Sequence, residues 1–197
     1  MIRLGVLGST NGTDLGSIIQ AIDAEELKAK ISVVVSNQKN AYILQRARVN
    51  KIPHHYISHK NEKREIFDQK INKILLQYNV DLILLIGFMR ILSGWFCTKW
   101  NEKILNVHPS LLPKYAGGMD KNIYKEVLKN KESETGCTIH FVTNELDAGP
   151  IFVQKQCSID SEDTIETLKS KVQALEATAF LEAIPMYEKK YLKLKSK

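Results

Sequence analysis

Short stretches in which nearly every residue is apolar alternate, along the first half of the chain, with longer stretches in which apolar residues recur every three or four positions. The first pattern is typical of parallel strands covered on both faces, and the second of amphipathic helices. Strands are predicted at 2–7, 31–35, 54–58 and 81–86, and helices at 15–24, 42–50 and 62–78. This alternation predicts βα units that build an α/β, doubly wound, mostly parallel sheet.

The second half of the chain has a different pattern. Two further strands are predicted, at 136–143 and 150–159. The short turn around Asp147 between them indicates an antiparallel pair. Asp163 followed by Glu166 then marks the start of a long final helix. Pro185 is expected to break or kink this helix, because proline lacks a backbone N–H and clashes with the preceding turn.

The composition indicates one domain. The chain has 197 residues, 44% of them apolar, which is enough for a single core of ordinary size. No linker rich in Pro, Gly or Ser interrupts it, so we expect one domain over residues 1–188. The lysine-rich residues 189–197 are expected to form a basic, frayed tail, with nucleic-acid binding as the alternative. The net charge of +6 favours anionic partners without identifying them.

Neither a membrane segment nor a metal centre is indicated. The N-terminus lacks the pattern of a signal peptide, and the longest apolar run, 82–86, is too short to cross a bilayer, so we expect a cytoplasmic protein. The cysteines lack Cys-x-x-Cys spacing and are expected to be small buried residues: Cys97, Cys137 and Cys157. The histidines at 54, 55 and 59 have no acidic or thiolate residue at ligand spacing, so no metal is expected.

The segment Asn-Val-His-Pro-Ser-Leu-Leu-Pro at 106–113 carries candidate chemistry. If the strand predicted before it continues to His108, the side chains of Asn106 and His108 leave the same face, and the prolines then end regular pairing. An Asn amide can donate a hydrogen bond to the oxyanion that forms when a carbonyl is attacked. A His can move the proton between nucleophile and leaving group, and a nearby Asp, such as Asp147, would stabilise the imidazolium. Each residue alone has a structural alternative in a turn or a hydrogen bond.

The nucleophile is expected to come from the substrate. Neither a Gly-x-Ser-x-Gly elbow nor a motif centred on a nucleophilic Cys is present. Acyl transfer therefore fits these residues better than hydrolysis through a covalent intermediate.

Two glycine-containing turns follow predicted strands. The turn at 8–16, Gly-Ser-Thr-Asn-Gly-Thr-Asp-Leu-Gly, can direct backbone N–H groups at an anion, although a structural turn is the alternative. It lacks the dinucleotide and nucleoside-triphosphate motifs, and the second strand ends in Ser-Asn where a dinucleotide enzyme has an acid. The turn at 87–92, Gly-Phe-Met-Arg-Ile-Leu, suits stacking and edge hydrogen bonds to a flat ring, with a core role as the alternative.

Four motifs in order, at 87–92, 106–115, 135–143 and 146–150, resemble those of the folate-dependent formyltransferases. The resemblance runs from about Ile2 to about Pro185 and is strongest to the branch that formylates phosphoribosylglycinamide in purine synthesis. It implies a Rossmann-like formyltransferase fold, 10-formyltetrahydrofolate as co-substrate, phosphoribosylglycinamide as acceptor, no metal, and a monomer or homodimer that binds neither nucleic acid nor membrane.

The resemblance also implies roles for individual residues. The catalytic residues would be Asn106, His108 and Asp147. The folate would be bound by Met89, Arg90, Ile91 and Leu92, together with Arg64, Asn106 and His140. The ribosyl phosphate would be held by Gly12, Thr13 and Asp14, and the ribose would be contacted by Glu176, for which an exposed helical acid is the alternative.

The chain departs from the family at two loops. The common form of the first is Ser-Gly-x-Gly-Ser-Asn, so Thr10, Thr13 and Asp14 differ, and a carboxylate at Asp14 would repel a phosphate unless it points away and caps the helix. The second, Ala116–Asp120, replaces Pro-Gly-Leu-His beside the acceptor.

These departures leave the formyl acceptor open. A sugar-amine formyltransferase and a formyltetrahydrofolate deformylase are the alternatives among enzymes. A transfer-RNA formyltransferase is disfavoured because no long C-terminal RNA-binding region is present. A non-catalytic binder of phosphorylated metabolites or RNA is the alternative from another class.

Overall fold

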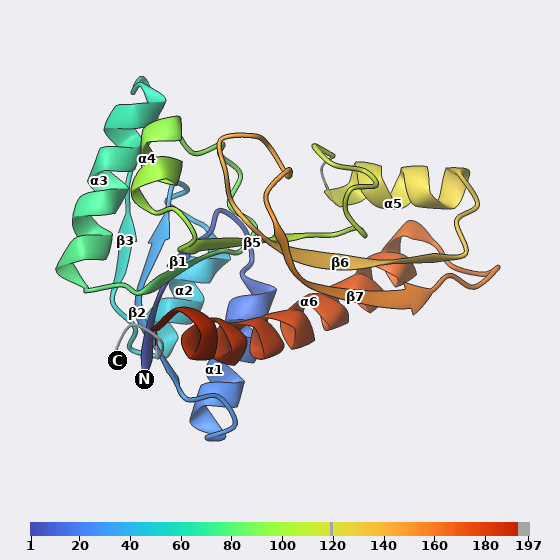
Figure 1. Ribbon diagram of the computed structural model, residues 1–197, viewed down its shortest axis with the longest axis horizontal. Coiled ribbons are helices and arrows are strands. Elements are labelled where there is room, and N and C mark those ends of the chain that lie inside the picture. Colours follow the sequence, from blue (N-terminus) through green and yellow to red (C-terminus); the bar gives the residue numbers. More distant parts are fainter. Residues whose placement is uncertain (119, 193–197) are drawn as a thin grey trace.

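A seven-stranded sheet with helices on both faces forms the protein (Figure 1). The computed structural model describes residues 1–118 and 120–192, with only the backbone of residues 120 and 121. The strand order is β3-β2-β1-β4-β5-β6-β7. The strands are β1 (Ile2–Leu7), β2 (Ala29–Ser36), β3 (His54–Tyr56), β4 (Leu82–Leu85), β5 (Ile104–His108), β6 (Glu134–Phe141) and β7 (Ile151–Ser158). The helices are α1 (Thr13–Asp23), α2 (Tyr42–Val49), α3 (Arg64–Gln77), α4 (Gly94–Lys99), α5 (Asp120–Lys129) and α6 (Ile165–Tyr187), followed by the π-helical η1 (Glu188–Leu192).

The predicted architecture is confirmed. Strands β1 to β5 pair in parallel, whereas β5 with β6 and β6 with β7 pair antiparallel, and the long α6 closes the fold. Every helix and strand predicted by hydrophobic periodicity is present, with ends displaced by a few residues. Two short helices, α4 and α5, were not predicted. The six residues of α4 are too few to show periodicity, although Ser93 caps them by accepting a hydrogen bond from the Phe96 N–H.

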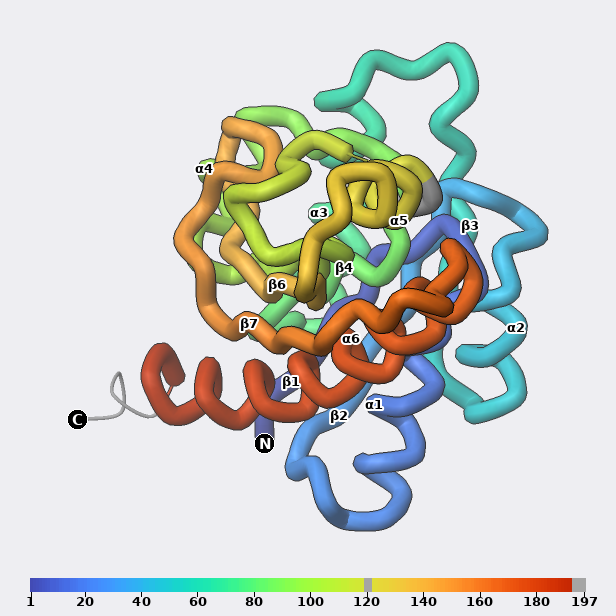
Figure 2. Tube along the Cα trace, turned by 90° about the vertical axis from the view of Figure 1, so that its right-hand side faces the viewer, coloured from blue at the N-terminus to red at the C-terminus, as the bar shows by residue number. Residues whose placement is uncertain are grey.

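The apolar strands separate two cores, because alternate residues of a strand point to opposite faces. In β2, Val34 packs with α1, α2 and α6, whereas Val33 and Val35 pack with α3 and α4. Along the opposite side of the sheet from α3, α6 lies against β6, β7 and α1 (Figure 2). Both faces of the central strands are therefore buried, which explains their nearly continuous apolar sequence.

Successive strands are added to the sheet first on one side of β1 (β2 and β3) and then on its other side (β4 to β7). Helix α1 leads from β1 to β2 on one side, and the chain later returns to β4 on the other side. At this switch point the turn after β1 and the turn after β4 meet, where the Ser9 N–H donates to the Gly87 carbonyl at 3.0 Å. A crevice at the carboxyl ends of strands is the usual ligand site of such folds.

The C-terminal helix differs from its prediction in one respect. Pro185 does not break α6, which continues to Tyr187, and the chain then forms the π-helical turn η1. Tyr191 in this turn stacks on Tyr187, with ring centroids 4.9 Å apart. Residues 189–192 of the predicted tail are thus helical, while 193–197 lie outside the described residues, so the domain boundary at 188 stays a prediction.

The remaining structural expectations concern cysteines and membrane segments. Cys97 and Cys137 are buried, as predicted, whereas Cys157 is half-buried on β7. None of the described helices has both the length and the apolar character needed to cross a membrane.

Close packing of β6 against β7 generates a testable prediction about stability. A Cβ atom added to Gly136 would lie 1.9 Å from the Lys155 carbonyl oxygen, and backbone cannot move aside as a flexible side chain can. Gly136→Ala is expected to lower the free energy of unfolding by about 3 kcal/mol, measured by urea denaturation. In the control Gly94→Ala, the new Cβ would meet its nearest atom at 3.4 Å. Equal stabilities of the two variants would contradict this account.

Candidate active site

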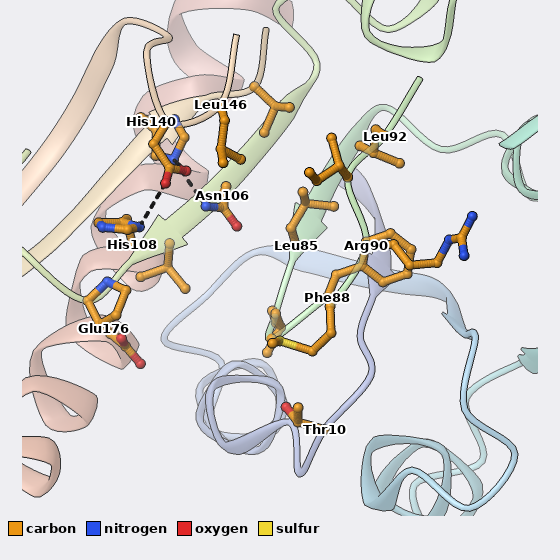
Figure 3. A pocket seen from close by; sticks show the side chains of 18 of the residues that line it. Thr10, Leu85, Phe88, Arg90, Leu92, Asn106, His108, His140, Leu146 and Glu176 are labelled. Carbon is orange, nitrogen blue, oxygen red and sulfur yellow. Dashed lines mark hydrogen bonds and ion pairs between the residues drawn. The ribbon is translucent and has the colours of Figure 1, made fainter. Parts of the chain in front are cut away.

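A cleft of about 930 Å³ opens at the carboxyl ends of β1, β4 and β5 (Figure 3). The turn between β6 and β7 and one face of α6 complete its wall. Most predicted site residues line it: Gly12, Thr13, Asp14, Met89, Arg90, Ile91, Leu92, Asn106, His108, His140, Asp147 and Glu176. Arg64 does not. It lies exposed at the start of α3, so its assignment to folate stays a prediction.

The three predicted catalytic residues come together. Strand β5 extends to His108, so Asn106 and His108 leave the same face of the sheet, as predicted. His108 Nδ1 lies 3.3 Å from Asp147 Oδ2, and both side chains are nearly buried, at 5% and 9% exposed. Antiparallel pairing places His140 of β6 directly opposite Asn106. An amide, two imidazoles and a carboxylate therefore form one cluster in the cleft.

His140 is a neutral acceptor in this cluster. Burial lowers its pKa below the ordinary histidine range. Its Nδ1 lies 3.0 Å from the Phe141 carbonyl oxygen, which can only accept, so Nδ1 carries the hydrogen. Nε2 then accepts a hydrogen bond of 3.0 Å from the Asn106 Nδ2. This contact orients Asn106 and leaves its second N–H for a ligand.

His108 is held on both sides by oxygen acceptors. Its Nε2 lies 3.0 Å from the Tyr115 carbonyl oxygen and its Nδ1 faces the Asp147 carboxylate. Neither a carbonyl oxygen nor an ionised carboxylate can donate, so a ring with hydrogen on both nitrogens satisfies both contacts, whereas the neutral ring can donate to only one of them.

Asp147 occupies a strained turn that fixes its carboxylate. Its φ of +52° lies in the left-handed region, which Asp adopts more readily than most residues. The turn also needs Gly149, where a Cβ would lie 1.8 Å from the Phe141 carbonyl oxygen. From the facing loop, the Gly117 N–H donates to Asp147 Oδ2 at 2.9 Å.

The predicted folate wall, residues 87–92, presents backbone and apolar groups. Gly87 has a φ of +57°, which turns the chain sharply after β4. Met89 and Ile91 are about half exposed, whereas Leu92 is buried. The Arg90 side chain points away from the catalytic cluster, and its guanidinium lies 4.5 Å over the Phe67 ring (Figure 3). Any contact of Arg90 with a ligand in this cleft is therefore expected from its backbone.

The glycine turn after β1 leads directly into α1. Gly12 is the N-cap residue, with a φ of +63°, and Thr13 and Asp14 form the first turn of the helix. The Asp14 side chain is 5% exposed, and its Oδ1 has no hydrogen-bond partner among the described residues. The N-cap residue itself is a glycine without a side chain, and the capping alternative for Asp14 stays a prediction.

Burial gives the Asp14 carboxyl an unusual protonation equilibrium, raising its pKa to about 7. Glu176 of α6 lines the same cleft and is buried. The alternative prediction, that Glu176 is an exposed acid on the surface of the helix, is therefore wrong. Burial, followed by the charges of Glu176 and Asp14, raises the pKa of the Cys137 thiol. Two carboxyl groups therefore share the end of the cleft that contains the glycine turn.

Sequence reasoning missed two backbone groups at the site, the Tyr115 carbonyl and the Gly117 N–H. A backbone group carries no side-chain signature, so residue types alone could not reveal either contact. Within the described part of the chain, no group of three or more His, Cys, Asp or Glu side chains could hold a metal ion.

Comparison with known proteins agrees with this geometry. The phosphoribosylglycinamide formyltransferase of Haemophilus influenzae is 38% identical over 196 residues, covering 99% of this chain and 91% of that protein. A crystal structure of a phosphoribosylglycinamide formyltransferase from Coxiella burnetii has a TM-score of 0.86 and 42% identity, covering 92% of this chain and 84% of that one.

A larger relative contains the same unit. The trifunctional purine biosynthetic protein adenosine-3 of Chironomus tentans is 39% identical over 198 residues, and the chain spans 14% of its length. Residues 2–184 match the formyl transferase family as a whole. Since that match covers nearly the whole chain and contains the glycine turn, the 87–92 wall and all the predicted catalytic residues, this protein belongs to the formyl transferase family.

Proposed function

We propose that this protein transfers the formyl group of 10-formyltetrahydrofolate to the amine of phosphoribosylglycinamide, a step of purine synthesis, in the cytoplasm. The observation that carries the proposal is the cluster of Asn106, His108 and Asp147 in a cleft that also contains the glycine turn at the start of α1. The relatives from Haemophilus influenzae and Coxiella burnetii support the same acceptor.

In the proposed reaction the acceptor amine attacks the formyl carbon. The carbonyl oxygen becomes negative as the tetrahedral intermediate forms, and hydrogen-bond donors fixed beforehand stabilise that charge. Asn106 supplies the N–H that His140 leaves unused, and His108 supplies a second donor once it has taken the proton of the attacking amine. Because both donors are already oriented, they need little rearrangement when the charge develops.

The proton balance assigns a role to His108. The attacking amine must lose a proton, and the folate nitrogen must gain one when its bond to the formyl carbon breaks. His108 relays this proton, with its ring oriented by the Tyr115 carbonyl at Nε2 and by Asp147 at Nδ1. The adjacent Asp147 carboxylate stabilises the imidazolium between the two transfers. The products are a formamide and tetrahydrofolate.

The two substrates would bind at opposite ends of the cleft. The phosphate of the acceptor is placed at the N-terminus of α1, where Gly12 and Thr13 offer backbone N–H groups. Glu176 is placed against the ribose, and residues 89–92 against the pterin. Asp14 borders the phosphate position, and its raised pKa lessens the negative charge that it would place there near neutral pH.

The proposal predicts acceptor-dependent loss of the formyl group. Turnover of a 10-formyl folate is followed by absorbance with and without phosphoribosylglycinamide. His108→Ala is expected to lower kcat by roughly 10²–10⁴-fold, because the proton relay is removed. Unchanged turnover in this variant would sink the role of His108.

The same assay separates the alternatives. Loss of the formyl group without acceptor would indicate a deformylase. Turnover only with an amino sugar would indicate a sugar-amine formyltransferase. No loss with any acceptor would favour a non-catalytic binding protein.

The protonation of Asp14 predicts a pH dependence of stability. Between the ordinary Asp pKa of about 4 and about 7, the folded protein holds a proton that the unfolded chain has released, so the free energy of unfolding falls as the pH rises. Asp14→Asn should remove this loss, which is roughly 4 kcal/mol between pH 4 and 8. Urea denaturation at several pH values measures it.

The matched control is Asp23→Asn, which removes an exposed carboxylate from the last turn of the same helix. Its stability should follow that of the wild type across the pH range. A wild-type protein and an Asp14→Asn variant with parallel pH profiles would show that Asp14 is ionised throughout.

A further inference from the structure

The short loop at 114–118, between β5 and α5, contacts the catalytic pair through its backbone. The Tyr115 carbonyl accepts a hydrogen bond from His108 Nε2 at 3.0 Å, and the Gly117 N–H donates to Asp147 Oδ2 at 2.9 Å. Tyr115 adopts a φ of +62°, in the left-handed region that a non-glycine residue occupies only at a cost of about 1–2 kcal/mol. Other contacts must therefore hold this residue in place.

Those contacts converge on Glu132, which lies between α5 and β6 outside the cleft. The Tyr115 phenol donates to Glu132 Oε1 at 3.0 Å and accepts from the Asn130 amide at 3.0 Å. The Lys114 ammonium donates to Glu132 Oε2 at 2.8 Å. Both oxygens of one carboxylate thus hold consecutive residues of the loop.

The opposite edge of the loop is also fixed. The buried Ser110 hydroxyl donates to the Lys114 carbonyl at 2.6 Å. The hydrogen bonds from Lys114 and Tyr115 lower the pKa of Glu132, which keeps it ionised at neutral pH. Tyr115 has its ring partly buried against the core, so its phenol and its carbonyl are connected by a rigid residue.

We propose that Glu132 is a positioning residue for His108, acting through Tyr115. This inference rests on the proposed function, because it assigns His108 the proton relay. The partners of the two ring nitrogens of a histidine decide how its ring is oriented and which nitrogen carries the hydrogen when the ring is neutral. The Tyr115 carbonyl favours a hydrogen on Nε2, and the Asp147 carboxylate favours one on Nδ1. If the carbonyl moves away, the ring loses one of the two contacts that orient it for the proton relay, and the neutral ring shifts toward hydrogen on Nδ1.

Kinetics of three single variants and one double variant test the proposal. Glu132→Ala and Tyr115→Phe are each expected to lower kcat about tenfold, because a small displacement of a catalytic group has large effects on rate. The KM values of both substrates should stay within about twofold of the wild-type values, since neither side chain lines the cleft. Glu132→Gln keeps an acceptor for the phenol and should recover part of the lost kcat. Because the two side chains act through one contact, the double variant should be no slower than the slower single variant.

The matched control is Glu182→Gln. Glu182 of α6 pairs with Lys155 on the surface, and it makes no contact with the 114–118 loop. This variant also removes a carboxylate from a Lys–Glu pair, and it should keep the wild-type kcat. Thermal denaturation of all variants shows how much of each preparation is folded, and Tyr115→Phe preserves the packed ring if Glu132→Ala fails to fold.

A measurement without substrate separates failure of this proposal from failure of the proposed function. In ¹⁵N-labelled free protein, the ring nitrogens of His108 report the balance between the two neutral forms of the ring. Glu132→Ala and Tyr115→Phe should shift this balance toward hydrogen on Nδ1 relative to the wild type. If the wild type shows no formyl transfer but the variants show this shift, the enzymatic function is overturned while the positioning role is supported. A balance that is the same in wild type and variants, or a wild-type kcat in both variants, would overturn the positioning role itself.

Discussion

The antiparallel pairing of β5 with β6 is the constraint on which the cleft depends. Adjacent residues of a strand point to opposite faces, so a slip of one residue would carry His140 away from Asn106. The register is fixed at the neighbouring pair, where Thr138 of β6 donates to the Ser110 carbonyl at 2.7 Å and accepts from the Leu112 N–H at 3.0 Å. These bonds also hold the extended segment that follows His108. The same strand pairing therefore positions the catalytic side chains and begins the loop that supports them.

The two histidines of the cluster differ because their backbone partners differ. His140 donates from Nδ1 to a carbonyl oxygen, which leaves Nε2 to accept from Asn106, whereas His108 donates from Nε2 to a carbonyl oxygen and turns Nδ1 toward Asp147. Burial lowers the pKa of His140, which favours its neutral form. Two identical side chains in one pocket can thus serve as a fixed acceptor and as the proposed proton carrier, because their partners differ.

Much of this arrangement follows from the sequence, and the remainder has a physical reason for escaping it. Continuous apolar strands and helical periodicity record burial directly, so the sheet and the longer helices were predictable. The spacing of Asn106 and His108 revealed their common face. Burial of Asp14 was not predictable, because a polar residue in a turn is usually solvated. Tyr115 and Gly117 contact His108 and Asp147 through backbone atoms, whose positions depend on tertiary structure rather than on residue type.

The turns that hold the two proposed substrates form one rigid unit, which bears on the proposed reaction. Ser9 donates from its hydroxyl to Asn37 at 2.5 Å, and the same oxygen accepts from the Met89 N–H at 2.8 Å. At Gly87 any Cβ would lie 2.3 Å from the Thr10 hydroxyl, so a threonine is accommodated at position 10 only because residue 87 has no side chain. The distance between the phosphate turn and the folate wall is therefore set before any ligand binds. Such a fixed frame matters most for a reaction between two substrates. The entropy lost when the two reactants are brought together is then offset by their binding energy, so this loss adds little to the barrier of the chemical step.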